Sequence, residues 1–157
     1  MPLNIVVVIL IIAFDQIIKW WATYSLKFKG TVPVIENAIQ FTYAENKGAA
    51  FSSFTAHTDL LIVISIMFVI VALILLVKYY KTSNLLRWSL VFIIGGALGN
   101  LIDRVRLSYV VDMIDFKIIN FPIFNVADSF ISIGAVLLVL YALRDLTKAG
   151  RKKRETS

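Results

Sequence analysis

The sequence contains no cysteine and only one histidine, His57. The absence of cysteine excludes disulfide bonds, thiolate metal sites and cysteine nucleophiles. A serine–histidine–aspartate triad or a multi-histidine zinc site would depend on a single imidazole. We therefore expect neither a metal ion nor another cofactor. His57 has no evident partner in the sequence and is interpreted as a surface or interfacial residue.

Charged residues are also scarce, at 17% of 157 residues, whereas apolar residues make up 59%. The mean hydropathy is +0.83, far above that of a soluble domain, in which roughly half of the residues are apolar. Four apolar runs are long enough to cross a hydrocarbon core of about 30 Å. The sequence therefore predicts an all-α polytopic membrane protein, a single integral membrane domain whose transmembrane helices span about 3–22, 60–78, 88–104 and 125–143.

The first apolar run resembles a secretion signal only superficially. It has no basic segment before it, it carries Asp15 and Lys19, and no convincing small-residue cleavage site follows. We interpret it as a retained helix.

Residues 23–58 differ in character, because VPVI, AIQFTY and AAFSSF are rich in β-branched and aromatic residues. These segments predict a small β-rich flap, which would need support from the bilayer surface or the helices. ENKGAAFSSF (Glu45–Phe54) has a turn signal at Asn46 to Gly48, followed by small and aromatic residues that could line a groove. An ordinary hairpin is the simpler alternative for this segment.

The net charge of +6 is typical of membrane topology or anionic lipid contact rather than of nucleic-acid binding. Basic residues gather between spans two and three and after span four: Lys78, Lys81, Arg87, Arg144, Lys148, Arg151, Lys152, Lys153 and Arg154. The positive-inside rule then predicts that both chain ends are cytoplasmic. The basic tail, 144–157, is interpreted as a topology signal and a solvated end.

With this topology, polar residues of three spans converge at the outer depth of the membrane: Asp15, Lys19, Asn100, Asp103, Arg104, Asn125 and Asp128. Ionisable side chains at membrane depth cost at least a few kcal/mol and usually have a function. Two simpler alternatives remain. Asp15 and Lys19, four residues apart, can neutralise each other, and Asp103 with Arg104 can form an interfacial ion pair.

Small residues precede this polar group on span three, in GGALG (Gly95–Gly99). Their spacing allows another helix to approach closely. Asn100 and Arg104 follow on one helix face, where Arg104 can donate several hydrogen bonds to a carboxylate, a phosphate or a carbonyl.

Two further carboxylates, Asp112 and Asp115, lie on the connection between spans three and four. If Asp112 and Asp128 meet, they share a proton near neutral pH, so that one acts as a base and the other as an acid. Such a pair can activate water against a peptide carbonyl without a metal ion, thiol or histidine. Asp115 is an alternative second member of the pair.

Two other functions fit buried acids in a membrane. A proton- or ion-coupled carrier would use Asp15, Asp103, Asp112 and Asp128 as a relay, but carriers usually show repeated or broken spans, and no internal repeat is found here. A noncatalytic scaffold would use the acids only to hold helices together.

Five blocks resemble the lipoprotein signal peptidase family, also called signal peptidase II. They are DQIIK (Asp15–Lys19), ENKGAAF (Glu45–Phe51), GGALGNLIDR (Gly95–Arg104), VVDMIDF (Val110–Phe116) and FNVADS (Phe124–Ser129). The resemblance implies four transmembrane helices with a small extracytoplasmic β-rich cradle and a short half-helix beside it. It also implies an intramembrane aspartyl protease that cuts diacylglyceryl-modified prolipoproteins just before the lipidated cysteine.

By this resemblance, Asp112 and Asp128 form the catalytic dyad. Substrate-binding or site-supporting roles are implied for Asp15, Lys19, Asn46, Gly48, Asn100, Asp103, Arg104, Asn125 and Ala127. We further expect Arg104 and Asn46 to hold backbone carbonyls near the scissile bond. The expected partners are the prolipoprotein, membrane lipids and globomycin-type inhibitors. The expected location is the bacterial inner (cytoplasmic) membrane, with a monomer whose active site lies near the outer leaflet.

Overall fold

The computed structural model describes residues 1–48, 58–119 and 121–155, and contains four helices long and apolar enough to cross a membrane. They are α1 (Pro2–Ser25), α2 (Thr58–Lys78), α3 (Asn84–Leu107) and α4 (Val126–Glu155). The predicted four-helix membrane fold is therefore confirmed. The predicted AAFSSF segment and His57 lie outside the described residues.

The helices extend beyond the expected spans because of local capping and chain continuation. α3 begins at Asn84 rather than at about 88, since the side chain of Ser83 accepts a hydrogen bond from Leu85 N at 3.2 Å. It ends where Ser108 adopts a left-handed conformation, with φ of 66°. α4 continues through most of the tail that the sequence suggested as a solvated end.

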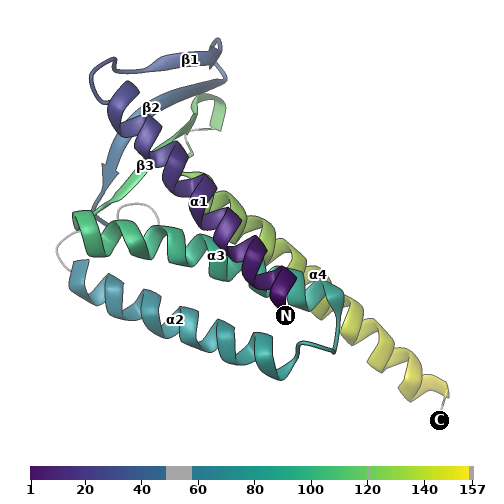
Figure 1. The fold of residues 1–157 in the computed structure, drawn as a ribbon. Helices are drawn as coiled ribbons and strands as arrows, with labels where there is room; N and C mark the ends of the chain where they lie inside the picture. Colours follow the sequence, from purple (N-terminus) through teal and green to yellow (C-terminus); the bar gives the residue numbers. More distant parts are fainter. Residues whose placement is uncertain (49–57, 120, 156–157) are drawn as a thin grey trace.

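α3 is the central helix of the bundle. It packs against α1, α2 and α4, and 61% of its most apolar stretch is buried, compared with at most 22% in the other three helices. In Figure 1, α2 runs beside α3, α1 reaches the sheet, and α4 runs from beside α1 to the end of the molecule opposite the sheet. The outward faces of these helices expose large apolar side chains such as Ile9, Val71 and Val136, which suits contact with lipid.

A small antiparallel sheet has the strand order β1 (Val32–Ile35), β2 (Ile39–Asn46) and β3 (Val110–Phe116). The first two strands come from the expected β-rich segment, but β3 is part of the connection between α3 and α4. It pairs with β2 so that Ala44 lies opposite Asp112. The sheet therefore places a sequence-predicted acid on a strand rather than on an irregular connection.

The sheet is supported by the end of α1. Ala22 of α1 and Leu26, which caps this helix, form one buried cluster with Val111 and Met113 of β3. The rings of Trp21 and Phe41 meet edge to face at 5.5 Å. This contact supplies the support that a three-stranded sheet needs. Apart from the short 3-10 turn η2 (Lys117–Ile119), the described residues contain no further helix corresponding to the half-helix that the resemblance implies.

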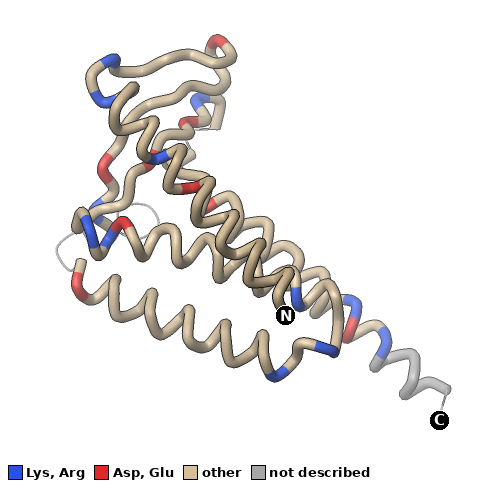
Figure 2. The backbone as a smooth tube through the Cα atoms, in the orientation of Figure 1, with Lys and Arg blue, Asp and Glu red and all other residues tan. Residues whose placement is uncertain are grey.

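Charged residues gather at the two ends of the bundle (Figure 2). Lys78, Lys81 and Arg87 lie at the α2–α3 connection, and Arg144 and Lys148 lie with Asp145 on the last coloured stretch of α4, whereas the sheet end carries both signs. The acids among these sheet-end residues include Asp15, Asp103, Asp112 and Asp128. The polar site is therefore built at the end opposite the tail.

Candidate active site

Six polar side chains at the sheet end of the bundle are almost completely buried. None exposes more than 6% of its surface: Asp15, Lys19, Asn100, Asp103, Asp112 and Asn125. They come from α1, α3, β3 and the residue before α4. Because a buried charge needs hydrogen-bonded partners, their contacts define how the site is built.

Lys19 is the hub of this cluster. Its Nζ atom lies 2.9 Å from Asp15 Oδ2 and 3.0 Å from Asp103 Oδ2, and it donates to Asn100 Oδ1 at 2.8 Å. Lys19 thus pairs not only with Asp15 on its own helix but also with Asp103 and Asn100 of α3. Removing one partner of such a buried pair costs about 3–5 kcal/mol.

Asp15 and Asp103 also hold backbone groups of neighbouring elements. Asp15 Oδ1 accepts a hydrogen bond from Ala127 N of α4 at 2.8 Å, and Asp103 Oδ2 accepts one from Val111 N of β3 at 3.1 Å. The simpler alternative paired Asp103 with the adjacent Arg104. In the structure, the ion-pair partner of Asp103 is instead Lys19. The cluster therefore ties α1, α3, β3 and α4 together.

Asn125 caps α4 and links the two candidate catalytic acids. Its Oδ1 accepts from Asp128 N at 2.9 Å, while Asp128 Oδ2 accepts from Asn125 N at 3.3 Å. This reciprocal arrangement is a capping box. The Nδ2 atom of Asn125 donates to Asp112 Oδ1 at 2.6 Å and to Asn100 Oδ1 at 3.1 Å.

The chain before Asn125 is aligned by a short backbone pairing. Ile114 N donates to Phe124 O at 2.8 Å, and Phe124 N donates to Ile114 O at 3.0 Å. Phe124 is therefore held beside β3. This pairing brings the start of α4 next to Asp112.

Asp112 and Asp128 each have defined donors. Asp112 Oδ2 accepts from Asn46 Nδ2 at 2.9 Å, and Asp128 Oδ1 accepts from Asn100 Nδ2 at 2.7 Å. Burial, together with the nearby charge of Asp128, raises the pKa of Asp112 to about 6. Asp115 is bonded elsewhere, by Gln40 of β2. The structure thus joins Asp112 to the start of α4, and not Asp115.

Close approach of α3, α1 and α4 depends on two glycines. A Cβ atom on Gly99 would lie 2.7 Å from Asp15 Oδ2, and one on Gly96 would meet the carbonyl oxygen of Ala127. Residues larger than glycine would push these elements apart. The small-residue pattern of α3 therefore allows the polar contacts to form, as well as the apolar packing that the sequence suggested.

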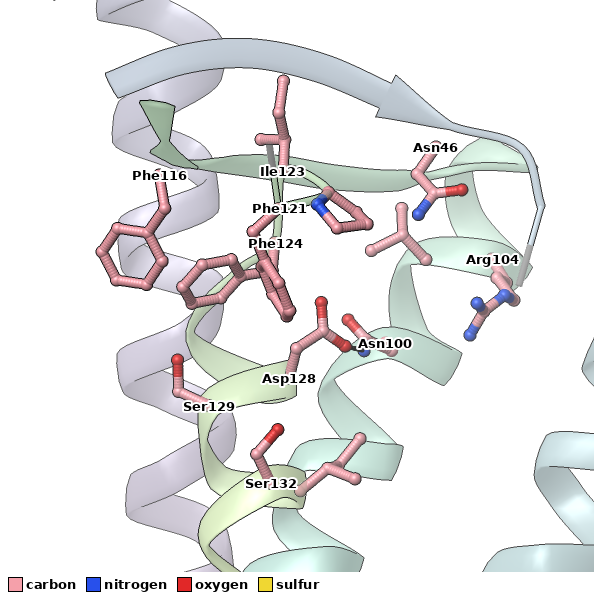
Figure 3. A pocket seen from close by; sticks show the side chains of 13 residues that line it. Asn46, Asn100, Arg104, Phe116, Phe121, Ile123, Phe124, Asp128, Ser129 and Ser132 are labelled. Atoms are coloured by element: carbon pink, nitrogen blue, oxygen red, sulfur yellow. Dashed lines mark hydrogen bonds between the residues drawn. The ribbon is translucent and has the colours of Figure 1, made fainter. Parts of the chain in front are cut away.

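A cavity of about 450 Å³ opens beside this cluster. Figure 3 shows Asp128 and Asn100 facing each other at its wall, with Arg104 and Asn46 on one side. The aromatic residues Phe116, Phe121 and Phe124 and the α4 residues Ser129 and Ser132 complete much of the lining. The cavity therefore combines a polar wall containing a carboxylate with an apolar aromatic wall.

Arg104 lines the cavity and contacts Gly48, which follows the end of β2. Arg104 Nη2 donates to Gly48 O at 3.3 Å, and Gly48 N donates to Asn46 Oδ1 at 3.0 Å. All the site residues suggested by the sequence thus lie in the cluster or at its border. Within the described parts of the chain, no three His, Cys, Asp or Glu side chains come together as a possible metal site.

The sequence interpretation missed Gln16 and the lining residues of α4 and the aromatic wall. Gln16 Nε2 lies 2.9 Å from Asp103 Oδ1 and 3.2 Å from Gly99 O. A signal was present, because an amide adjacent to Asp15 within an apolar span is itself unusual. Ser129 and Ser132 follow Asp128 on α4, but serine in a transmembrane helix indicates no function by itself.

Comparisons with known proteins agree with this geometry. A model of the family described as signal peptidase (SPase) II matches residues 7–144. The lipoprotein signal peptidase of Halothermothrix orenii is 46% identical over 138 residues, which cover 87% of this chain and 92% of that protein. The lipoprotein signal peptidase of Clostridioides difficile is 41% identical over 145 residues, covering 90% and 95%.

Two solved structures of bacterial membrane enzymes are similar to this chain in fold and in sequence. One, described as a bacterial membrane enzyme, superposes with a TM-score of 0.89 and 30% identity, covering 94% of this chain and 92% of that one. A second has a TM-score of 0.84 and 31% identity, covering 92% and 95%. Sequence and fold agree over nearly the whole length, and the chain belongs to the signal peptidase II family.

Proposed function

We propose that this protein is an intramembrane aspartyl endopeptidase that removes signal peptides from prolipoproteins, with Asp112 and Asp128 as its catalytic dyad. The family and its named relatives support the reaction. One observation carries the residue assignment: the Asn125 side chain donates to Asp112 and accepts from the backbone of Asp128. Two carboxyl groups from different elements are thereby held together beside a cavity.

The proposed reaction uses one ionised and one protonated carboxyl group. The carboxylate takes a proton from water as the water oxygen bonds to the peptide carbonyl carbon, and the acid donates its proton to the carbonyl oxygen. As the C–N bond breaks, the carboxyl group that took the proton from water gives it to the leaving amine, and a hydroxyl group of the tetrahedral intermediate returns a proton to the other carboxylate. The raised pKa of Asp112 favours it as the proton-holding member, and the place of Asp128 in the cavity wall favours it as the base.

We propose that the substrate is diacylglyceryl-modified and is cut just before the lipidated cysteine. The cavity supports this, since its polar wall suits a peptide backbone while Phe116, Phe121 and Phe124 suit an apolar group. The lipid-facing surfaces of α1, α2 and α4 are apolar, so acyl chains can remain in the bilayer. The same cavity would accommodate globomycin-type inhibitors.

The surrounding residues have separate proposed roles. Arg104 lines the cavity and uses one donor on Gly48, so its remaining N–H groups can hold a substrate carbonyl. The amide of Asn46 donates to Asp112, and its oxygen accepts from Gly48. We therefore propose that Asn46 orients Asp112 in addition to bordering the substrate.

We also propose that the protein is a monomer in the bacterial cytoplasmic membrane, in contact with its lipids. The basic residues at the α2–α3 connection and in the tail favour cytoplasmic termini (Figure 2). The dyad then lies near the outer leaflet, because it is at the opposite end of the bundle.

The test is cleavage of a diacylglyceryl-modified prolipoprotein by purified, detergent-solubilised protein. We expect the parent to cut before the lipidated cysteine, and Asp112→Asn and Asp128→Asn to remain folded but inactive. Asp115→Asn is the matched control, since its carboxylate is bonded to Gln40 instead, and it should retain activity.

Cleavage by a folded Asp112→Asn or Asp128→Asn variant would contradict the dyad. Failure of a folded parent to cleave, with the lipid requirement met, would contradict the reaction. Loss of assembly in both variants would instead favour a purely structural role for the acids.

A further inference from the structure

Each proposed catalytic aspartate directly follows a residue whose backbone N–H is held by a buried carboxylate. Ala127, which precedes Asp128, donates to Asp15 Oδ1 at 2.8 Å. Val111, which precedes Asp112, donates to Asp103 Oδ2 at 3.1 Å. Because one backbone step separates each held N–H from a dyad residue, the distance between the Asp15 and Asp103 carboxylates helps to set the distance between the dyad members.

Two side chains of α1 connect these two carboxylates. Lys19 Nζ lies 2.9 Å from Asp15 Oδ2 and 3.0 Å from Asp103 Oδ2. Gln16 Nε2 lies 2.9 Å from Asp103 Oδ1 and 3.3 Å from Asp15 Oδ2, and 3.2 Å from Gly99 O. Gln16 has only two amide hydrogens for these three acceptors, so its shortest contact, to Asp103, is its main one.

We propose that Gln16 is a positioning residue that fixes the separation of Asp112 and Asp128 by bracing Asp103 against α1. The proposal rests on the proposed function of the dyad. Lys19 has three acceptors around its ammonium group, which are the Oδ2 atoms of Asp15 and Asp103 and the Oδ1 atom of Asn100. Gln16 contacts the other oxygen of Asp103. Together they hold both oxygens and so prevent the carboxylate from rotating away from Val111.

The neutrality of Gln16 is part of this role. The charged groups that face it are Asp15 and Lys19 on α1 and Asp103 on α3, while α4 contributes the backbone N–H of Ala127. Two carboxylates and one ammonium group already leave an excess of negative charge. An amide supplies a hydrogen-bond donor without adding negative charge, whereas an ionised glutamate would repel both carboxylates.

The first test is the Gln16→Leu variant, which keeps similar bulk and removes the donor. We expect kcat to fall about tenfold or more while KM changes by less than about twofold, since a small misplacement of reacting groups lowers the rate of the chemical step. Gln40→Leu is the matched control. It removes an amide donor from Asp115, outside the dyad contacts, and should keep kcat within about twofold of the parent.

The second test is the pH profile of Gln16→Glu. A protonated glutamic acid can still donate one hydrogen bond to Asp103, but an ionised one repels it. We therefore expect the activity of Gln16→Glu relative to the parent to fall as pH rises, whereas Gln16→Leu should be impaired at every pH. A residue needed only for folding would lower the melting temperature and leave the kcat of the folded fraction unchanged.

A folded Gln16→Leu variant with the kcat and pH profile of the parent would overturn this role. If that variant does not fold, a Gln16→Glu profile parallel to the parent's would overturn it. Both results are distinguishable from failure of the proposed function, which would appear as an inactive parent or an active Asp112→Asn variant.

Discussion

Asp112 occupies an environment in which burial and the charge of Asp128 favour its protonated form, while hydrogen bonds from Asn46 and Asn125 favour the ionised form. The first two effects dominate and raise its pKa to about 6. This places the proton within the range where an acid of the dyad can both hold and release it. In the proposed dyad, the amide donors therefore help to set the pH at which Asp112 loses its proton.

Replacing Asn46 by alanine should move that range upward. Asn46→Ala removes a donor that stabilises the ionised form of Asp112, so the pKa of Asp112 should rise above about 6. If Asp112 must be protonated, activity is lost as pH rises through this pKa, and the loss should occur at higher pH in the variant. The measurement is the alkaline limb of kcat/KM, which reports the free enzyme.

The control for this profile is Gln40→Leu, which removes an amide donor from Asp115 and not from Asp112. Its alkaline limb should coincide with that of the parent. An Asn46→Ala limb at unchanged or lower pH would show that Asp112 is not the proton-holding member.

Arg104 should contribute to turnover through substrate contact. Arg104→Ala removes the guanidinium from the cavity wall, and we expect kcat/KM to fall about 10- to 100-fold, as for loss of a charge-assisted hydrogen bond. Arg104→Lys should restore little, because lysine lacks the planar set of donors. Arg106→Ala, at an exposed position of the same helix, is the control. Unchanged turnover and inhibitor affinity in Arg104→Ala would contradict this role.

Among individual residues, the topology of the spans suggested that Asp112, Asp115 and Asp128 lie at one depth, and only the family resemblance singled out Asp112 and Asp128 as the pair. The sequence was not sufficient to assign their neighbours. The two-sided hydrogen bonding of Asn125 and the contact of Gln16 with Asp103 depend on side-chain directions. Such directions are set by packing between elements that are distant in sequence.

At the level of elements, the spans were predictable because about 20 consecutive apolar residues have few alternatives to a membrane helix. Their ends were less predictable, since they depend on capping groups such as Ser83. β3 was not predicted as a strand at all. Its partner is β2, which lies before two intervening helices, and a short run such as VVDMIDF carries no clear alternation of buried and exposed residues.

The contact between α3 and α4 should be sensitive to a single methyl group. Gly96→Ala would place its Cβ against the Ala127 carbonyl and 2.8 Å from Ile131, so α4 must shift. We expect a loss of about 1–3 kcal/mol of stability and a larger loss of activity, because Ala127 and Asp128 shift with the helix. Melting temperature and cleavage rate measure the two effects.

Ala135→Val is the control for added bulk, since Ala135 is exposed on α4. It should leave both quantities near those of the parent. Parent-like activity of Gly96→Ala would mean that the approach of α4 to α3 does not determine the geometry of the dyad.

On the scale of the whole molecule, the two ends of the helix bundle differ in charge and in the groups that they bury. The end with the tail carries mostly Lys and Arg, and the sheet end carries the buried acids and the cavity (Figure 2). α3 passes through the bundle and contacts every other helix. We therefore infer that α3 fixes the relative positions of the acids on α1, β3 and α4.

This arrangement predicts opposite exposure of the two ends across the membrane, and the absence of cysteine makes the prediction directly testable. Thr31 is exposed beside the sheet, and Thr82 is exposed on the α2–α3 connection. In right-side-out vesicles, a membrane-impermeant thiol reagent should label Thr31→Cys, and it should label Thr82→Cys only after permeabilisation. The parent, which has no thiol, gives the background, and retained cleavage by both variants shows that they are folded. Labelling of Thr82→Cys in intact vesicles, with Thr31→Cys protected, would contradict this orientation. The sheet end and the proposed dyad would then lie near the inner leaflet, against the positive-inside rule.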